Sequence, residues 1–129
     1  MRCEKLGLIY HRVIKSKWWE SHTMAPSAIL INEETIRVFL GCWDRKQISR
    51  IGYIDVDATN PLKIIKISNK AVLDIGEDGT FDENGVFPAH ANKIDNKIYL
   101  YYTGFQLGFK IRHYNFGGLA ISNNNGNSF

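Results

Sequence analysis

The chain has 129 residues, of which 44% are apolar and 12% aromatic, so its size and composition are those of one globular domain. The formal charge of +3 comes from 16 basic and 13 acidic residues scattered along the chain. No run of five or more like charges indicates a nucleic-acid-binding arm or a membrane-binding stripe. We therefore expect a globular protein with no nucleic-acid and no membrane partner.

The N-terminal sequence MRCEKLGLIYHRV predicts no signal peptide, because its apolar stretch is short and no small-residue cleavage site follows. No stretch approaches the roughly 18 apolar residues that a membrane span needs. Cys3 and Cys42 lie far apart and show neither CxxC spacing nor a secreted disulfide pattern, so we expect free thiols. A cytoplasmic protein is the resulting expectation.

Short segments rich in Ile, Val, Tyr and Phe alternate with turn-forming clusters along the chain. No stretch keeps a helical apolar period for the ten or so residues that a helix needs, so the sequence predicts an all-β fold. Tight hairpin turns are expected at residues 32–34 and 95–96, because Asn and Asp tolerate the left-handed backbone of such turns. The predicted strands are, in chain order, residues 26–32, 35–43, 49–57, 62–68, 86–94, 97–105 and 113–122.

An internal repeat is the most informative feature of the sequence. Aligning Pro26 with Pro88 places APSAILINEETIRVFLGCW on FPAHANKIDNKIYLYYTGF without a gap. Both copies contain a strand, a turn, an alternating apolar strand and a terminal aromatic residue, which is Trp43 in the first copy and Phe105 in the second. A third strand recurs too, since residues 51–54 have their counterpart in residues 117–121. A chance similarity of short strands is the alternative explanation.

Repeated units of this length with four antiparallel strands predict blades of a β-propeller, because one blade cannot cover both of its own faces and must stack on its neighbours. The C-terminal sequence SNNNGNSF matches the "Asp box" pattern S-x-D-x-G-x-x-aromatic, found between the third and fourth strands of blades, with Asn124 in place of Asp. We therefore expect one partial propeller domain over residues 1–129. Its parts are an N-terminal segment (1–25), a first blade (26–68), an inter-blade loop (69–85) and a second blade without its last strand (86–129).

Two blades would leave one inner face and one strand edge uncovered. Self-association, a missing C-terminal portion, or another polypeptide that completes the ring would each cover them.

Two segments carry a family resemblance. The sequence FDENGVF at residues 81–87, followed by IYLYYTG at residues 98–104, resembles the second-blade pattern of glycoside hydrolase family 32. The ordered string from Trp19 through Ser122 is similar to uncharacterised family-43-like proteins associated with bacterial surface-polysaccharide genes. The resemblance implies a five-bladed propeller, of which about two blades are present, that acts on a glycoside or a surface polysaccharide. It implies a carbohydrate ligand and no cofactor.

The same resemblance implies two opposed carboxyl groups, supplied by different blades, for glycoside hydrolysis. The sequence departs from that pattern, because Ala25 stands where the first-blade Asp is expected, His90 stands in the second inner strand, and the third blade is absent. Asp44, Asp82 and His90 remain as weak catalytic candidates. Asp82 either faces a sugar or caps its own loop, because Asp-Glu-Asn-Gly also favours a turn. This chain alone is expected to be inactive.

Five residues are candidates for binding a carbohydrate: His22, Trp43, Asp44, Arg45 and His90. Asp44 and Arg45 resemble an Arg–Asp pair at a sugar-binding rim, or else form an exposed ion pair in a turn. His22 and His90 flank the inner strands, where an imidazole would donate to a sugar hydroxyl or have a structural role. Trp43 would stack on a sugar ring or pack in the core.

The loop at residues 74–82 is rich in oxygen donors but lacks the spacing of a calcium loop, so no metal site is predicted. Three functional hypotheses remain. The parent protein acts on glycosides, or it is a non-catalytic carbohydrate-binding or structural propeller, or it is a protein-interaction propeller.

Overall fold

The computed structural model describes residues 3–11 and 16–129, and this part of the chain is all-β, as predicted. Four strands form one antiparallel sheet and three form a second. No helix in the described part is long and apolar enough to cross a membrane. The strands are β1 (Thr23–Asn32), β2 (Thr35–Trp43), β3 (Ser49–Asp57), β4 (Ile64–Ile67), β5 (Val86–Ile94), β6 (Lys97–Leu107) and β7 (His113–Ser122).

Every predicted strand is present, and β2, β3, β5 and β7 have the predicted ends. The first predicted hairpin turn is also present, and there the side-chain oxygen of Asn32 accepts the amide of Glu34 at 3.0 Å. The prediction of free thiols is confirmed, with Cys3 exposed and Cys42 buried. Local β propensity and turn chemistry are therefore sufficient to define the elements.

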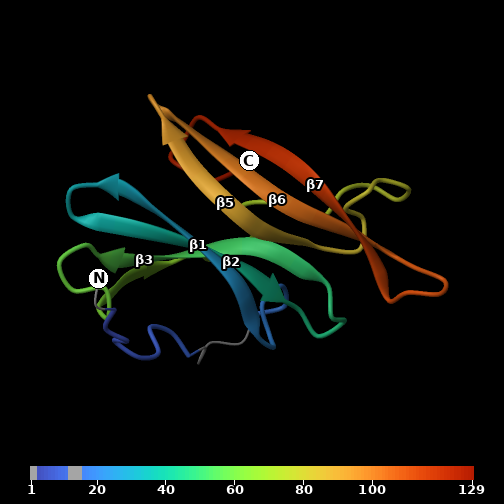
Figure 1. Cartoon of the computed structure of the whole chain (residues 1–129), viewed down its shortest axis with the longest axis horizontal. Helices are drawn as coiled ribbons and strands as arrows, with labels where there is room; N and C mark the ends of the chain where they lie inside the picture. Colours follow the sequence, from blue (N-terminus) through green and yellow to red (C-terminus); the bar gives the residue numbers. More distant parts are fainter. Residues whose placement is uncertain (1–2, 12–15) are drawn as a thin grey trace.

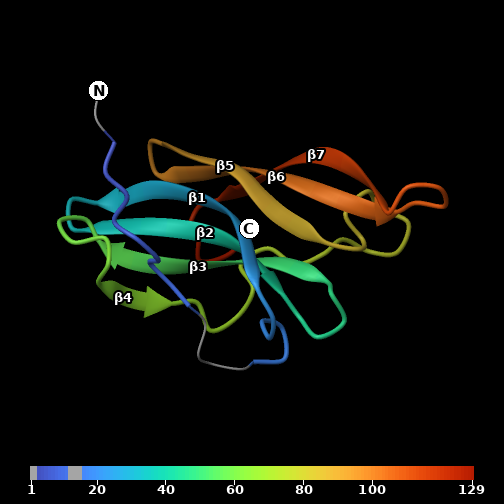
Figure 2. The same cartoon turned by 60° about the horizontal axis from the view of Figure 1, so that its bottom comes forward.

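The first sheet is a meander with the order β1-β2-β3-β4, and its central strands β2 and β3 are buried on both faces. One face carries Val38, Leu40 and Ile54, which pack with Trp19. The N-terminal segment around Leu8–Tyr10 runs across this face (Figure 2). The opposite face carries residues such as Phe39 and packs against the second sheet.

The second sheet has the order β5-β6-β7 and forms a separate layer over the first (Figure 1). β5 makes the contacts with β1, β2 and β3. Hydrogen bonds also join the layers. The amide of Ala91 donates to Ser27 Oγ at 2.8 Å, the Ser49 hydroxyl donates to the carbonyl of Val86, and Lys93 Nζ donates to the carbonyl of Ile31 at 2.6 Å. The main core of the protein lies between the two sheets.

The sequence repeat is a structural repeat. The pair Phe39↔Tyr53 in the first sheet has its counterpart in Tyr101↔Leu119 in the second, as the sequence alignment requires. The hairpins differ in their irregularities. The register of β1 and β2 shifts near Ala25 and again near the turn, whereas that of β5 and β6 shifts once, before His90. The described residues thus form two repeated three-strand meanders, and the first carries a fourth strand.

The Asp-box-like sequence forms a compact turn after β7, which we call the C-terminal turn (residues 122–129). The side-chain oxygen of Asn124 accepts the amides of Asn127 and Ser128, both at 3.1 Å. Ser122 Oγ accepts the amide of Gly126 at 2.9 Å. Asn124 therefore performs the acceptor role that an Asp would have at this position.

Candidate functional site at the shared rim

The structure brings aromatic rings from both sheets together at one end of the molecule, where β1, β5 and β7 begin and β2 and β6 end. The ring of His22 stacks on Trp43 with centroids 5.0 Å apart and an interplanar angle of 16°. Trp43 stacks on Phe105 at 6.0 Å, and Phe105 contacts His113 at 5.4 Å. We call these four residues the rim aromatic row.

The repeat explains how the row forms. Trp43 and Phe105 are equivalent residues near the ends of equivalent strands, so packing one sheet on the other places their rings in contact. Gly85 makes room for Phe105, because its φ is +154° and a Cβ at this position would lie 2.2 Å from Phe105 Cζ. A side chain at residue 85 would therefore displace the centre of the row.

The row has a buried middle and polar, exposed ends. Phe105 is 7% exposed and Trp43 is half-buried, while His22 and His113 are exposed. Ser21 Oγ lies 3.1 Å from His22 Nδ1, which orients that imidazole. Flat apolar rings flanked by imidazoles can stack on the apolar face of a sugar ring and hydrogen-bond to its hydroxyl groups.

Asp44 caps a turn at this rim. Its carboxylate accepts the amides of Lys46 and Ile48 at 2.8 and 2.9 Å and pairs with Arg50 at 2.9 Å. Burial raises the pKa of the Asp44 carboxyl, but these hydrogen bonds and the guanidinium outweigh it and hold the pKa below its ordinary value. Asp44 is thus ionised at neutral pH and cannot serve as a proton donor.

Asp44 forms its ion pair with Arg50, and not with Arg45 as the sequence suggested. Arg50 binds Asp44 and also Asp74, at 2.7 Å. Arg45 is exposed, and within residues 3–11 and 16–129 it forms no ion pair. Arg50 faces Asp44 across the β2–β3 turn, whereas the adjacent Arg45 is exposed to solvent.

Asp82 is buried beneath the second sheet and caps its loop. The Tyr102 hydroxyl donates to Asp82 Oδ2 at 2.8 Å, and Thr80 Oγ1 lies 2.9 Å from Oδ1. The backbone carbonyl of Asp82 also accepts the amide of Gly85 at 3.4 Å. Burial, and then the Asp82 carboxylate, raise the pKa of Tyr102 to about 12. Both groups therefore hold structure together rather than face an open site.

His90 lies away from the rim aromatic row. It stands at the register shift in β5, opposite Tyr101, and is exposed on the face of the second sheet that points away from the first. Ala91 on the other face is buried in the core. Ala25 lies near the start of β1 at the rim and has a φ of +52°. The structure thus brings together His22 and Trp43 among the predicted residues, and it leaves His90 apart.

Two members of the row were not predicted as site residues. Phe105 was recognised only as the repeat counterpart of Trp43, and that equivalence was the available signal. His113 begins β7 after a long hairpin loop and carried no signal in the sequence, because its contact with Phe105 depends on the pairing of β6 with β7.

Comparisons with known proteins identify distant relatives. No protein-family model matches the chain. The chain is 31% identical over 122 residues to uncharacterised proteins of two Mycobacterium tuberculosis strains, CDC 1551 and H37Rv. The matched region is 95% of this chain and 41% of each relative, so the chain spans less than half the length of the curated relatives that it matches.

Proposed function

We propose that this chain is part of a β-propeller that binds carbohydrate at the rim aromatic row, with a glycoside-hydrolase-like fold and no catalytic carboxylate pair of its own. The row itself carries this proposal, because it offers stacked rings across two repeated sheets with an exposed imidazole at each end. Aromatic faces combined with hydrogen-bonding tips suit a ligand that has an apolar face and polar edges, as a sugar ring has.

The propeller part of the proposal is supported by the outer face of the second sheet. In the first sheet, Phe39 and Tyr53 are covered by the second sheet and are 0% and 4% exposed. Their repeat equivalents, Tyr101 and Leu119, are 48% and 49% exposed. A further sheet of the same repeat, packed as the second packs on the first, would cover this face. The greater length of the relatives is consistent with such a sheet.

Binding is favoured over cleavage because the candidate acids are already engaged. Asp44 is held ionised by two amides and Arg50, and Asp82 accepts the Tyr102 hydroxyl. Neither carboxyl group is placed to protonate a leaving group, which glycoside hydrolysis requires.

The carbohydrate proposal is tested by screening a glycan array and then measuring the affinity of the best oligosaccharide by calorimetry. Trp43→Ala and His22→Ala should each weaken binding about three- to tenfold, the effect of losing one aromatic contact. Phe109→Ala is the matched control, because Phe109 is 98% exposed in the β6–β7 loop and lies outside the row. Absence of any glycan binding, or equal affinities in all variants, would refute the proposal.

The same protein preparations test the alternative that the chain cleaves glycosides. We expect no release of arabinose, xylose or fructose from chromogenic glycosides. Asp44→Asn and Asp82→Asn should lower stability, because each weakens the contacts of a carboxylate that holds a turn or a loop in place. Cleavage that either substitution abolishes, with the fold retained, would establish the enzyme and contradict our proposal.

A further inference from the structure

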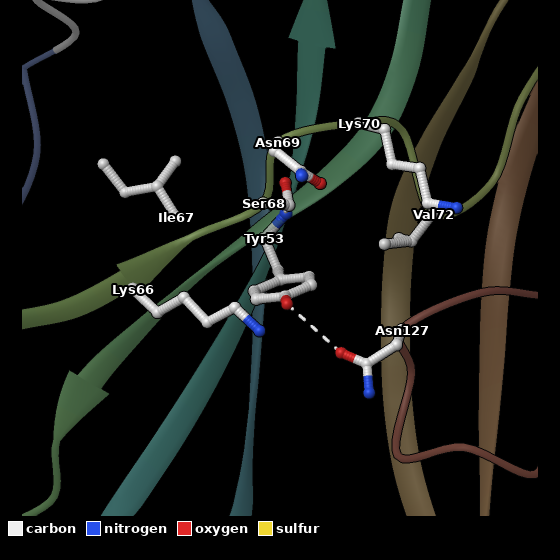
Figure 3. Close-up of a pocket in the computed structure, with 8 residues that line it drawn as sticks. All are labelled: Tyr53, Lys66, Ile67, Ser68, Asn69, Lys70, Val72 and Asn127. Atoms are coloured by element: carbon white, nitrogen blue, oxygen red, sulfur yellow. Dashed lines mark hydrogen bonds between the residues drawn. The ribbon is translucent and has the colours of Figure 1, made fainter.

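A cavity lies between β4 and the C-terminal turn. It has a volume of about 350 Å³ and is lined by residues of β3, β4, the loop after β4 and the C-terminal turn. Figure 3 shows the Lys66 ammonium beside the Tyr53 ring and Asn127 on the other side of that ring. Asn69 and Lys70 lie on the loop after β4, and the Lys70 ammonium lies beside Val72, on the side away from Lys66. Its size suits a small molecule or a charged group of a larger one.

The cavity is held in place by contacts between the two repeats. The Tyr53 hydroxyl and the Arg37 guanidinium both donate to Asn127 Oδ1 at 3.2 Å. The Phe129 amide donates to the carbonyl of Val72 at 2.9 Å. These contacts join the C-terminal turn to the first sheet, so the cavity wall is supported from both sides before any ligand arrives.

The charge of the cavity is positive. Within the described part of the chain, the residues that line it include Lys66 and Lys70 and no acidic side chain. Arg37, whose guanidinium carbon lies 3.5 Å from the centroid of the Tyr53 ring, is neutralised by Asp55 at 2.7 Å. Neither lysine forms an ion pair with any carboxylate in the described part of the chain. Lys66 and Lys70 therefore place two cationic side chains without counter-charges at opposite sides of one cavity.

Neutral hydrogen-bond donors complete the lining. Ser68 Oγ accepts the Tyr53 amide at 3.0 Å, which leaves its proton to donate. The side-chain amide of Asn69 is exposed beside the two lysines. Lysine ammonium groups bind phosphate as point charges, whereas carboxylates are more often held by the two-pronged guanidinium of arginine. Among the described residues that line the cavity there is no arginine, and the nearby Arg37 is occupied by Asp55, so this lining favours phosphate.

We propose that the cavity between β4 and the C-terminal turn binds a phosphate group, with Lys66 and Lys70 as its counter-ions and Ser68 and Asn69 as neutral donors. The group is either inorganic phosphate or the phosphate of a phosphorylated sugar, because both present the same charged oxygens. The proposal is independent of carbohydrate binding at the rim, since the two sites share no residue.

The test is titration calorimetry at low ionic strength with three probes: inorganic phosphate, glucose 6-phosphate and glucose. We expect both phosphate probes to bind this cavity and glucose not to bind it. The probe that binds more tightly shows whether the cavity prefers inorganic phosphate or the phosphate of a phosphorylated sugar. Lys66→Ala and Lys70→Ala should each weaken phosphate binding about tenfold, the effect of removing one charged contact. Both side chains are exposed, so the variants should fold.

The matched control is Lys97→Ala with Lys110→Ala, which removes two exposed charges from the second sheet and its loop. Trp43→Ala should leave phosphate binding unchanged. A failure of the carbohydrate proposal at the rim can therefore be told apart from a failure of the phosphate proposal. The proposal is overturned if neither phosphate binds. It is also overturned if the two cavity lysine variants bind as the unsubstituted protein does, or if the control pair weakens binding equally.

Discussion

Arg37 and Asp55 form a buried ion pair, and removing one partner should destabilise the fold. The two side chains are 5% and 7% exposed, and the guanidinium donates to both carboxylate oxygens at 2.7 and 2.8 Å. Asp55→Ala would leave a buried guanidinium without a counter-ion. Such changes cost about 3–5 kcal/mol, a large share of the stability of a small domain.

The double variant Arg37→Met with Asp55→Ala separates the charge effect from the loss of packing. It removes both charges, so we expect it to be about 2 kcal/mol more stable than Asp55→Ala alone. Arg37 also donates to the carbonyl of Asn125 at 2.6 Å. Because Asn125 is exposed, water can replace that bond when arginine is absent. Arg37 donates to Asn127 Oδ1 as well, but Asn127 is exposed and keeps the Tyr53 hydroxyl as a donor. The double variant should therefore lose little beyond the ion pair itself.

The measurement is urea unfolding at pH 7 followed by tryptophan fluorescence, with the slope of free energy against urea compared among variants. Lys63→Ala is the control, because it removes only the Asp57–Lys63 pair, in which the lysine is 66% exposed, and this pair should contribute much less, and less still at high salt. A cost below about 1 kcal/mol for Asp55→Ala, or a double variant less stable than the single one, would refute the reasoning.

Two further predictions concern backbone strain and pH. Ala25 has a φ of +52°, which an alanine adopts at a cost of about 1 kcal/mol, so Ala25→Gly should raise the urea midpoint, whereas Ala28→Gly, in an extended part of β1, should lower it. Equal effects at both positions would contradict the inference that the backbone is strained at Ala25. The pKa of Tyr102 is raised from 10.0 to about 12 by burial and by Asp82, so its stabilising contribution is complete below pH 10 and is lost as the pH rises through 12. Tyr102→Phe should therefore flatten the decline in stability between pH 10 and 12, and an unchanged decline would count against the Tyr102–Asp82 contact.

Several parts of the fold follow from local sequence. Alternating β-branched and aromatic residues, divided by Asn and Asp turns, predicted every strand, because strand formation and tight turns depend on neighbouring residues. The repeat also predicted that Trp43 and Phe105 are equivalent, and the Asp-box pattern predicted a turn at the C-terminal sequence. In each case the interactions that decide the outcome lie within a few residues or within one hairpin.

The candidate sites depend on contacts between distant segments. Asp44 pairs with Arg50 rather than with the adjacent Arg45, because the turn from β2 to β3 aims the two side chains differently. His90 was expected with His22, yet the register shift in β5 turns it onto the outer face of the second sheet.

The sequence by itself determined the all-β class, the strand positions and the repeat, because these depend on local propensity and period. Only the tertiary structure decided that His22 and His113 end one aromatic row, and that Lys66 and Lys70 share a cavity with Asn127. Those groupings depend on how one sheet packs on the other. The free energy of that packing comes from buried surface shared by segments far apart in the chain, which no local pattern records.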